Sequence, residues 1–237
     1  MCRTIITNGT IVNDGEHFIG SIIVKGEFIE SVIKGKLPEN IAYDTDRIID
    51  ASGKWILPGV IDDQVHFREP GLTHKAEIAT ESVAAVAGGI TSFMEMPNTV
   101  PQTTTLEALE WKYSRAAEVS PANYSFYIGA TNDNFEVLKQ VDFSQVCGVK
   151  IFMGSSTGNM LVDKMNSLLN IFNGTDMLIA AHCEDQETIK NNIAKYKEMF
   201  AGENDIPIGK HPYIRSSAAC YASSELAVRL ARIAGAR

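Results

Sequence analysis

The feature that most constrains the fold of this chain is a regular alternation of short apolar segments with amphipathic segments, which begins at Trp55. Each apolar segment ends in polar or glycine-containing residues, as buried strands do where they leave a sheet. The predicted strands are WILPGVIDDQVHF, GITSFMEMP, NYSFYIGAT, GVKIFMG and DMLIAAHC. The predicted helices lie at about 75–87, 104–118, 161–172, 185–201 and 216–234. Strands that alternate with helices in this order predict an α/β fold.

The last predicted helix, 216–234, has a clear apolar face and a clear end. Leu226, Leu230 and Ile233 recur at spacings of four and three, which places them on one side of a helix. Gly235 follows directly and is typical of the residue that ends a helix in a left-handed conformation. We therefore expect these three side chains to face the core.

The first 55 residues have a different rhythm, in which β-like runs alternate with turn signals. Asn8-Gly9 and Gly26 are the residues expected at turns between these runs. This pattern predicts a small antiparallel β unit that precedes the α/β region.

Five strands with helices between them fit either an open doubly wound sheet or most of a (β/α)8 barrel. Neither GxGxxG nor GxxxxGK[ST] follows the first strand, which disfavours a nucleotide-binding fold. Histidine, lysine and asparagine residues instead occur at the ends of separate strands, and barrel active sites are built in this way. The chain stops at Arg237, where the pattern calls for a sixth strand. We therefore predict an incomplete barrel from a truncated chain, which is inactive by itself.

Composition excludes several classes of function. The net charge of −8 disfavours broad binding to nucleic acids or anionic membranes, which requires clustered lysine and arginine. The sequence contains neither an apolar run of about 18 residues nor a secretory signal pattern, so a cytoplasmic location is expected. The four cysteines form no CxxC pair, which predicts free thiols.

The stretch PGVIDDQVHFREPG carries three of the candidate site residues. Gln64 and His66 are two residues apart at the end of a strand, so both side chains are expected on the same side. His66 alone is also compatible with a residue that caps a strand. Arg68 suits bidentate capture of a carboxylate, although Glu69 or Glu95 are alternative partners for it.

The other candidates lie at the ends of later strands. His182 ends LIAAHC and, considered alone, is also compatible with a hydrogen-bonded core residue. Lys150 lies in the apolar strand GVKIFMG, and the cost of burying an ammonium requires that it be paired, neutral or modified. Asn98, in MEMPNT, is either a turn residue or a polar contact for a substrate. The segment GSSTGN, 154–159, lacks the lysine of a phosphate loop and is interpreted as a loop at the site. Surface roles are expected for three further histidines, His17, His74 and His211.

Taken in order, LPGVIDDQVHFREPG, MEMPNT, GVKIFMGSSTGN and LIAAHCED resemble the dihydroorotases of the amidohydrolase superfamily, which belong to its cyclic amidohydrolase group. The resemblance covers essentially the whole chain, and HFREPG is its most specific part. It implies a metal-dependent (β/α)8 barrel, of which 56–237 would be the first part with about five β/α units. Residues 1–55 would form the N-terminal part of an accessory β unit.

The family interconverts L-dihydroorotate and N-carbamoyl-L-aspartate in pyrimidine biosynthesis, with one or two zinc ions per subunit. By resemblance, His66 and His182 would be metal ligands, and Lys150 would bridge the metals as a carboxylysine. Arg68 and Asn98 would bind the substrate carboxylate. The family's proton-transferring aspartate would lie beyond Arg237. The expected partner is the small-molecule substrate, with no nucleic acid or membrane, and a homodimer is left open.

One position departs from the family pattern, which opens with His-x-His. Gln64 stands in the first position, and an amide oxygen is a weaker zinc ligand than imidazole. A dihydroorotase-like subunit without catalysis is the alternative that this residue motivates. An allantoinase or a hydantoinase is the alternative among enzymes, and Arg68 argues against it because those substrates lack the ring carboxylate. A soluble α/β binding domain is a third alternative.

Overall fold

The computed structural model describes residues 3–39, 41, 46–154 and 158–237. The chain divides into two compact units, Met1–Val60 and Ile61–Arg237. The second unit contains all of the candidate site residues.

The first unit is a five-stranded sheet. Its strands are β1 (Arg3–Asn13), β2 (Glu16–Lys25), β3 (Phe28–Lys34), β4 (Arg47–Asp50) and β5 (Trp55–Ile56). The order is β3-β2-β1-β4, and β5 also pairs with β1. β2 is antiparallel to both β1 and β3, whereas β4 and β5 run parallel to β1.

Two sequence predictions for this unit were wrong in part. The sheet is mixed rather than antiparallel, because β4 and β5 pair with β1, which is not their neighbour in the sequence. Asn8-Gly9 is not a turn between strands. Asn8 has a φ of 64°, and the register shifts between Ile6 and Gly9, so the pair forms a bulge within a continuous β1.

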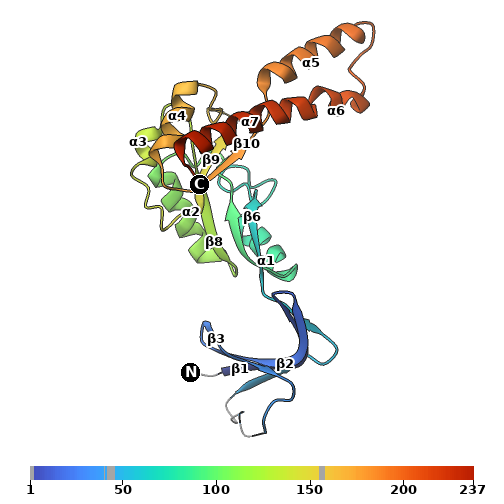
Figure 1. The fold of residues 1–237 in the computed structure, drawn as a ribbon, viewed down its shortest axis with the longest axis vertical. Helices are drawn as coiled ribbons and strands as arrows, with labels where there is room; N and C mark the ends of the chain where they lie inside the picture. The colour runs from blue at the N-terminus through green and yellow to red at the C-terminus, as the bar shows by residue number, and fades with distance from the viewer. Residues whose placement is uncertain (1–2, 40, 42–45, 155–157) are drawn as a thin grey trace. The chain divides into compact units, whose positions relative to one another are not determined.

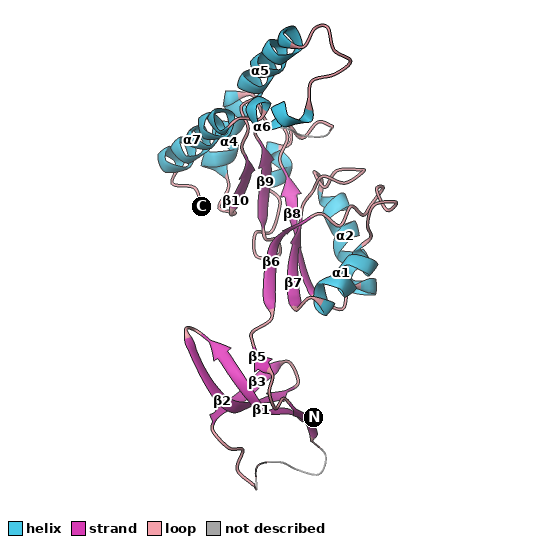
Figure 2. Cartoon of the chain, turned by 90° about the vertical axis from the view of Figure 1, so that its right-hand side faces the viewer, coloured by secondary structure: helices cyan, strands magenta, loops and turns pink. Residues whose placement is uncertain are grey.

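The second unit contains a sheet of five strands in chain order (Figure 2). They are β6 (Val60–Val65), β7 (Ile90–Glu95), β8 (Asn123–Gly129), β9 (Gly148–Phe152) and β10 (Ile179–His182). The pairs β7–β8, β8–β9 and β9–β10 are parallel. The sheet curls like part of a barrel, so the α/β barrel prediction is confirmed for this part of the chain.

Helices connect these strands (Figure 1). They are α1 (Ile78–Ala87), α2 (Leu106–Val119), α3 (Phe135–Leu138), α4 (Met165–Gly174), α5 (Gln186–Met199), α6 (His211–Ile214), α7 (Ser217–Ala234) and the short 3-10 helix η1 (Ile208–Lys210). Several of them cover the sheet, whereas α5 and α6 extend away from it. Side chains cap several N-termini: Thr105 accepts a hydrogen bond from the backbone N–H of Ala108, and Ser216 accepts one from Ala219.

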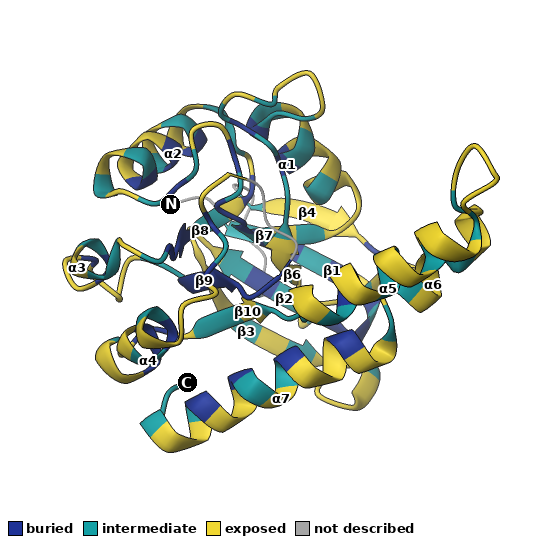
Figure 3. Cartoon of the chain, turned by 90° about the horizontal axis from the view of Figure 1, so that it is seen from above, coloured by how far each residue is buried: buried dark blue, intermediate teal, exposed yellow. Residues whose placement is uncertain are grey.

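The C-terminal helix α7 ends as predicted, and two of its three predicted core residues face the core: Leu230 is buried, and Leu226 is partly buried against it. Gly235 adopts the left-handed conformation, with a φ of 68°. Ile233, however, is 71% exposed, so its predicted core position was wrong. The buried stripe, visible along α7 in Figure 3, consists of small residues together with Leu230. These small residues are Ala219, Ser223 and Ala227. Small side chains allow a helix to pack closely, and this packing sets the rotation of α7.

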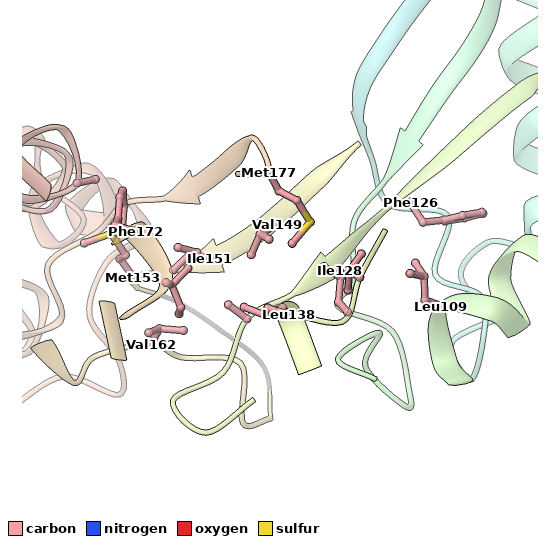
Figure 4. Close-up of a cluster of buried hydrophobic side chains, with 14 of the residues drawn as sticks. Leu109, Phe126, Ile128, Leu138, Val149, Ile151, Met153, Val162, Phe172 and Met177 are labelled. Carbon is pink, nitrogen blue, oxygen red and sulfur yellow. The ribbon is translucent and has the colours of Figure 1, made fainter. Parts of the chain in front are cut away.

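The core of the second unit lies between the sheet and its helices (Figure 4). Phe126 and Ile128 on β8 and Val149 and Ile151 on β9 are fully buried. Alternate residues of a strand face opposite sides, so this packing leaves Lys150 on the other face of β9, which points into the curl of the sheet. The apolar face of the strands therefore fixes the direction of the candidate site.

Three further features belong to the described residues as a whole. The backbone N–H of Ile179 donates to the carbonyl of Arg237 at 2.9 Å, so the last residue lies beside the start of β10. None of the described helices combines the length and the apolar character needed to cross a membrane. Cys147, Cys183 and Cys220 are free thiols.

Candidate active site

The candidate residues lie at or near the carboxyl ends of four strands of the second unit. His66 follows β6, Asn98 follows β7, Lys150 lies within β9, and His182 ends β10. Carboxyl ends of parallel strands meet at one edge of a sheet, which is the edge where barrel enzymes bind their substrates.

A hydrogen bond joins the residues after β6 and β7. Nδ1 of His66 lies 2.8 Å from Oδ1 of Asn98. An amide oxygen only accepts, so Nδ1 carries the proton, and Nε2 retains its lone pair. Burial lowers the pKa of His66, the positive charge of Arg68 lowers it further, and the bond to Asn98 opposes both. His66 is therefore a neutral imidazole with a free nitrogen, which is the form that binds metals.

The Arg68 side chain is half-buried and makes no hydrogen bond or ion pair with any other described residue. Both acids named as alternative partners are already bound elsewhere. Glu69 accepts from Nε of Arg115 at 2.8 Å and from the backbone N–H of Ile78 at 2.8 Å. Glu95 pairs with Lys112. The guanidinium is thus left available for an anion from solution.

Lys150 is only 4% exposed. Within the described parts of the chain its Nζ has no ion-pair partner, and it lies 5.2 Å from the centre of the Phe152 ring. Burial lowers the pKa of Lys150. Of the three states that the sequence left open, pairing with a described acid is therefore excluded, and a neutral or modified lysine is left.

His182 faces the same side of the sheet as Lys150. It is the register partner of Phe152, which is two residues from Lys150 on β9. Nε2 of His182 lies 3.0 Å from Oε2 of Glu184. Glu184 also accepts two hydrogen bonds from Arg215, one of them from Nε to Oε1 at 2.8 Å. His182 is thus held by an acid whose charge Arg215 offsets.

Other candidates are less tied to the site. Gln64 is exposed, and its backbone N–H donates to Oδ1 of Asp62 at 3.1 Å, whereas its side chain makes no hydrogen bond with another described residue. Residues 155–157 of the predicted loop 154–159 lie outside the described residues. Three histidines are exposed, as expected: His17, His74 and His211. In the described ranges, no group of three or more His, Cys, Asp or Glu side chains is arranged to hold a metal.

Two ion pairs beside the site, Glu95–Lys112 and Glu184–Arg215, were not predicted from the sequence. The Glu95–Lys112 pair could have been predicted from a pattern in the sequence. Lys112 lies three residues after Leu109 and four before Ala116, which is the buried face of α2. A lysine on such a face requires an acid, and Glu95 was the charged residue of the apolar strand FMEM.

Comparison with known proteins gives a family for this chain. The model of the family described as dihydro-orotase-like matches residues 53–235. Among curated proteins, dihydroorotase from Bacillus subtilis is 37% identical over 193 residues, which cover 78% of this chain and 42% of that protein. Dihydroorotase from Methanosphaera stadtmanae is 31% identical over 213 residues, with 89% and 46% covered. The chain thus spans less than half the length of these relatives.

Solved structures give the same fold. The L-hydantoinase (dihydropyrimidinase) from Arthrobacter aurescens superposes with a TM-score of 0.89 at 26% identity, over 100% of this chain and 52% of that one. Dihydropyrimidinase from Brevibacillus agri, at 23% identity and a TM-score of 0.81, supports the fold. Because the family model covers well over half of the sequence, the chain belongs to the dihydro-orotase-like family.

Proposed function

We propose that the protein is a metal-dependent cyclic amide hydrolase that interconverts L-dihydroorotate and N-carbamoyl-L-aspartate in pyrimidine biosynthesis. The observation that carries this proposal is the half-buried guanidinium of Arg68, which has no acid partner among the described residues. Both compounds carry a carboxylate, and a guanidinium binds a carboxylate through two parallel hydrogen bonds. The curated relatives named dihydroorotase support the choice of substrate.

Asn98 has two tasks in this proposal. Its Oδ1 holds Nδ1 of His66 at 2.8 Å, which fixes the ring and the position of its proton. Its amide NH2 group makes no bond to another described side chain and is free to donate to the substrate carboxylate beside Arg68. The same residue would thus align the substrate with the imidazole, because one rigid side chain contacts both.

The residues present fit a zinc site, on the evidence of Lys150. A buried lysine without an acid carries an uncompensated charge, whereas carboxylation of its amine would create a carboxylate, which is a zinc ligand. We assign His66 to the first metal position, His182 to the second and the carboxylated Lys150 to both. Gln64 would complete the first position only weakly, so the protein would hold one or two zinc ions.

A zinc ion bound by these residues would polarise the amide carbonyl and lower the pKa of a water molecule. The chain's own residues bind and orient the substrate. Arg68 and Asn98 hold the carboxylate, which fixes the ring relative to His66.

The test is turnover by the intact protein with L-dihydroorotate, allantoin and hydantoin, together with its zinc content and the mass of the peptide that contains Lys150. Turnover of L-dihydroorotate, bound zinc and a mass increase of one carboxyl group on Lys150 would support the proposal. A preference for hydantoin would favour the activity for which the structural neighbour from Arthrobacter aurescens is named. Absence of both zinc and turnover would favour a non-catalytic subunit, for which the exposed Gln64 is the motive.

Three assignments accompany this proposal. Residues 1–55 would belong to an accessory β unit and 56–237 to the first part of the barrel. The protein would act in the cytoplasm on a small-molecule substrate. A homodimer is the oligomeric form to test, by measuring the molecular mass of the protein in solution.

A further inference from the structure

A buried ion pair lies behind the proposed carboxylate-binding residues. Glu95, the last residue of β7, and Lys112, in the middle of α2, are both 0% exposed. Nζ of Lys112 bonds to Oε2 of Glu95 and donates to the backbone carbonyl of Met96 at 3.1 Å. It also lies 5.5 Å from the centre of the Phe126 ring. Lys112 is therefore fixed by both a charge and a carbonyl at the end of β7.

The other side of the carboxylate faces the segment that carries Arg68. Burial raises the pKa of Glu95, and Lys112 together with the nearby backbone N–H groups of Arg68 and Phe67 opposes this rise. Oε1 of Glu95 nevertheless accepts no hydrogen bond of normal geometry from the described residues, although it is buried. A carboxylate attracts N–H groups that lie near it, and Arg68, which carries one of these two groups, adopts a φ of 68°.

The pair also reaches Asn98. Met96, whose carbonyl accepts from Lys112, lies two residues before Asn98, and its own N–H donates to the carbonyl of Val65 at 3.0 Å. One ion pair thus links the carboxyl ends of strands β6 and β7. These two ends carry the His66–Asn98 bond and the Arg68 guanidinium.

A purely structural role does not require charges at this place. Replacing a buried ion pair by apolar residues of similar volume is often neutral or stabilising, because desolvation of the charges costs as much as their attraction gains. Core stability alone would favour an apolar pair between α2 and β7. The pair is also tied to the backbone at the ends of β6 and β7, because Lys112 bonds to the carbonyl of Met96 and the N–H of Met96 bonds to the carbonyl of Val65.

We propose that the Glu95–Lys112 pair is a positioning device that holds the backbone at Phe67 and Arg68 and thereby aims the Arg68 guanidinium at a substrate carboxylate. The inference rests on the proposed function for the identity of the ligand. It goes beyond that function because neither residue touches the substrate. The positioning acts on ligand binding through the backbone.

Three variants separate positioning from packing: Glu95→Gln, Lys112→Met and the double variant. Lys112→Met keeps the apolar length of the side chain and leaves Glu95 without its cation. The double variant replaces the ion pair by a neutral pair of similar size. Tyr113→Phe is the matched control, since Tyr113 is the next residue of α2 and its hydroxyl bonds to Ser125, away from the Arg68 segment.

Two readouts are needed on the intact protein. Hydrogen exchange of the peptide 66–72 reports the backbone, and calorimetric titration with L-dihydroorotate reports the dissociation constant. We expect faster exchange in 66–72 and affinity weakened by about tenfold in Lys112→Met and in the double variant, as is common when an outer partner of a site is lost. Tyr113→Phe should match the wild type in both readouts.

The outcomes are separable. Recovery of wild-type exchange and affinity in the double variant would overturn the inference, because a neutral pair would then suffice. Unchanged exchange in 66–72, or faster exchange with unchanged affinity, would also overturn it. If the wild type binds no L-dihydroorotate, the proposed function fails, and the exchange of 66–72 alone decides whether the pair holds the backbone. If Lys112→Met does not fold, the double variant supplies the same comparison.

Discussion

Arg68→Gly should make the protein more stable and at the same time weaken its binding of substrate. Arg68 has a φ of 68°, a left-handed conformation that costs an L-residue roughly 1–2 kcal/mol. Glycine adopts it without this cost but loses more conformational freedom on folding, which reduces the gain in stability by roughly 0.5–1 kcal/mol. The side chain makes no hydrogen bond with other described residues, so its removal forfeits none. The expected net gain is about 0.5–1 kcal/mol.

The effect on binding has the opposite sign. A hydrogen bond that involves a charged group contributes about 1.5–3 kcal/mol. Loss of the guanidinium should therefore weaken binding of L-dihydroorotate by roughly 10-fold to 150-fold. Backbone strain at a functional residue predicts this combination of higher stability and weaker binding. The strained conformation costs stability, but it directs the side chain toward the substrate.

The assay pairs scanning calorimetry with calorimetric titration on the intact protein. We expect the thermal midpoint of Arg68→Gly to rise by about 1–4 °C. Arg68→Lys is the control, because lysine keeps the positive charge and has the same energetic cost at a positive φ. The thermal midpoint of this variant should therefore equal that of the wild type. A lower midpoint for Arg68→Gly would refute the reasoning about strain. Unchanged affinity would refute the role of Arg68 in binding.

Three further predictions concern stability and need only the folded chain. Burial raises the pKa of Cys147 from 9.0 to about 11, so folding favours its thiol form. This contribution is complete below pH 9 and is lost as pH rises through 11, by at most about 2–3 kcal/mol, and Cys147→Ala should remove the loss in urea titrations. Gly235→Ala places a side chain at a φ of 68° and should cost about 1 kcal/mol, seen as a lower thermal midpoint. Tyr127→Phe removes a hydroxyl that donates to the carbonyl of Asp63 at 3.2 Å. It should lower the free energy of unfolding by about 1 kcal/mol, as measured by urea titration.

The sheet of the second unit was predictable from its strand sequences, of which that of β9 is buried along its whole length and those of β7 and β8 are buried in part. Such strands read as short apolar runs, and the helix signals between them set their parallel direction. The N-terminal unit was less predictable. Alternating runs and turns identify strands, but they do not say that β4 pairs with β1 across the intervening hairpin. Pairing between distant strands depends on tertiary packing, which local pattern does not encode.

In the candidate site, too, some features were predictable from the sequence and others depend on tertiary packing. The strand-end positions of His66, Lys150 and His182 followed from the order of strands, because parallel strands align their carboxyl ends. The partners of the charged residues did not follow. Glu69 was a candidate for Arg68 by proximity in sequence, yet it bonds to Arg115 on α2. Choice among charged partners depends on which helix covers which strand end, and that is decided by core packing.

These partner choices lead to a pattern in the charges of the site. Three acids adjoin the candidate residues: Glu69, Glu95 and Glu184. Each is paired with a cation that follows or lies within a helix: Arg115, Lys112 and Arg215 respectively. Arg68 and Lys150 are thereby left without acid partners among the described residues, although the whole chain has a net charge of −8. Because the acids beside the site are neutralised by cations from the helices, the guanidinium of Arg68 keeps its positive charge free. Its attraction for an anionic substrate is stronger in this half-buried place than in bulk water.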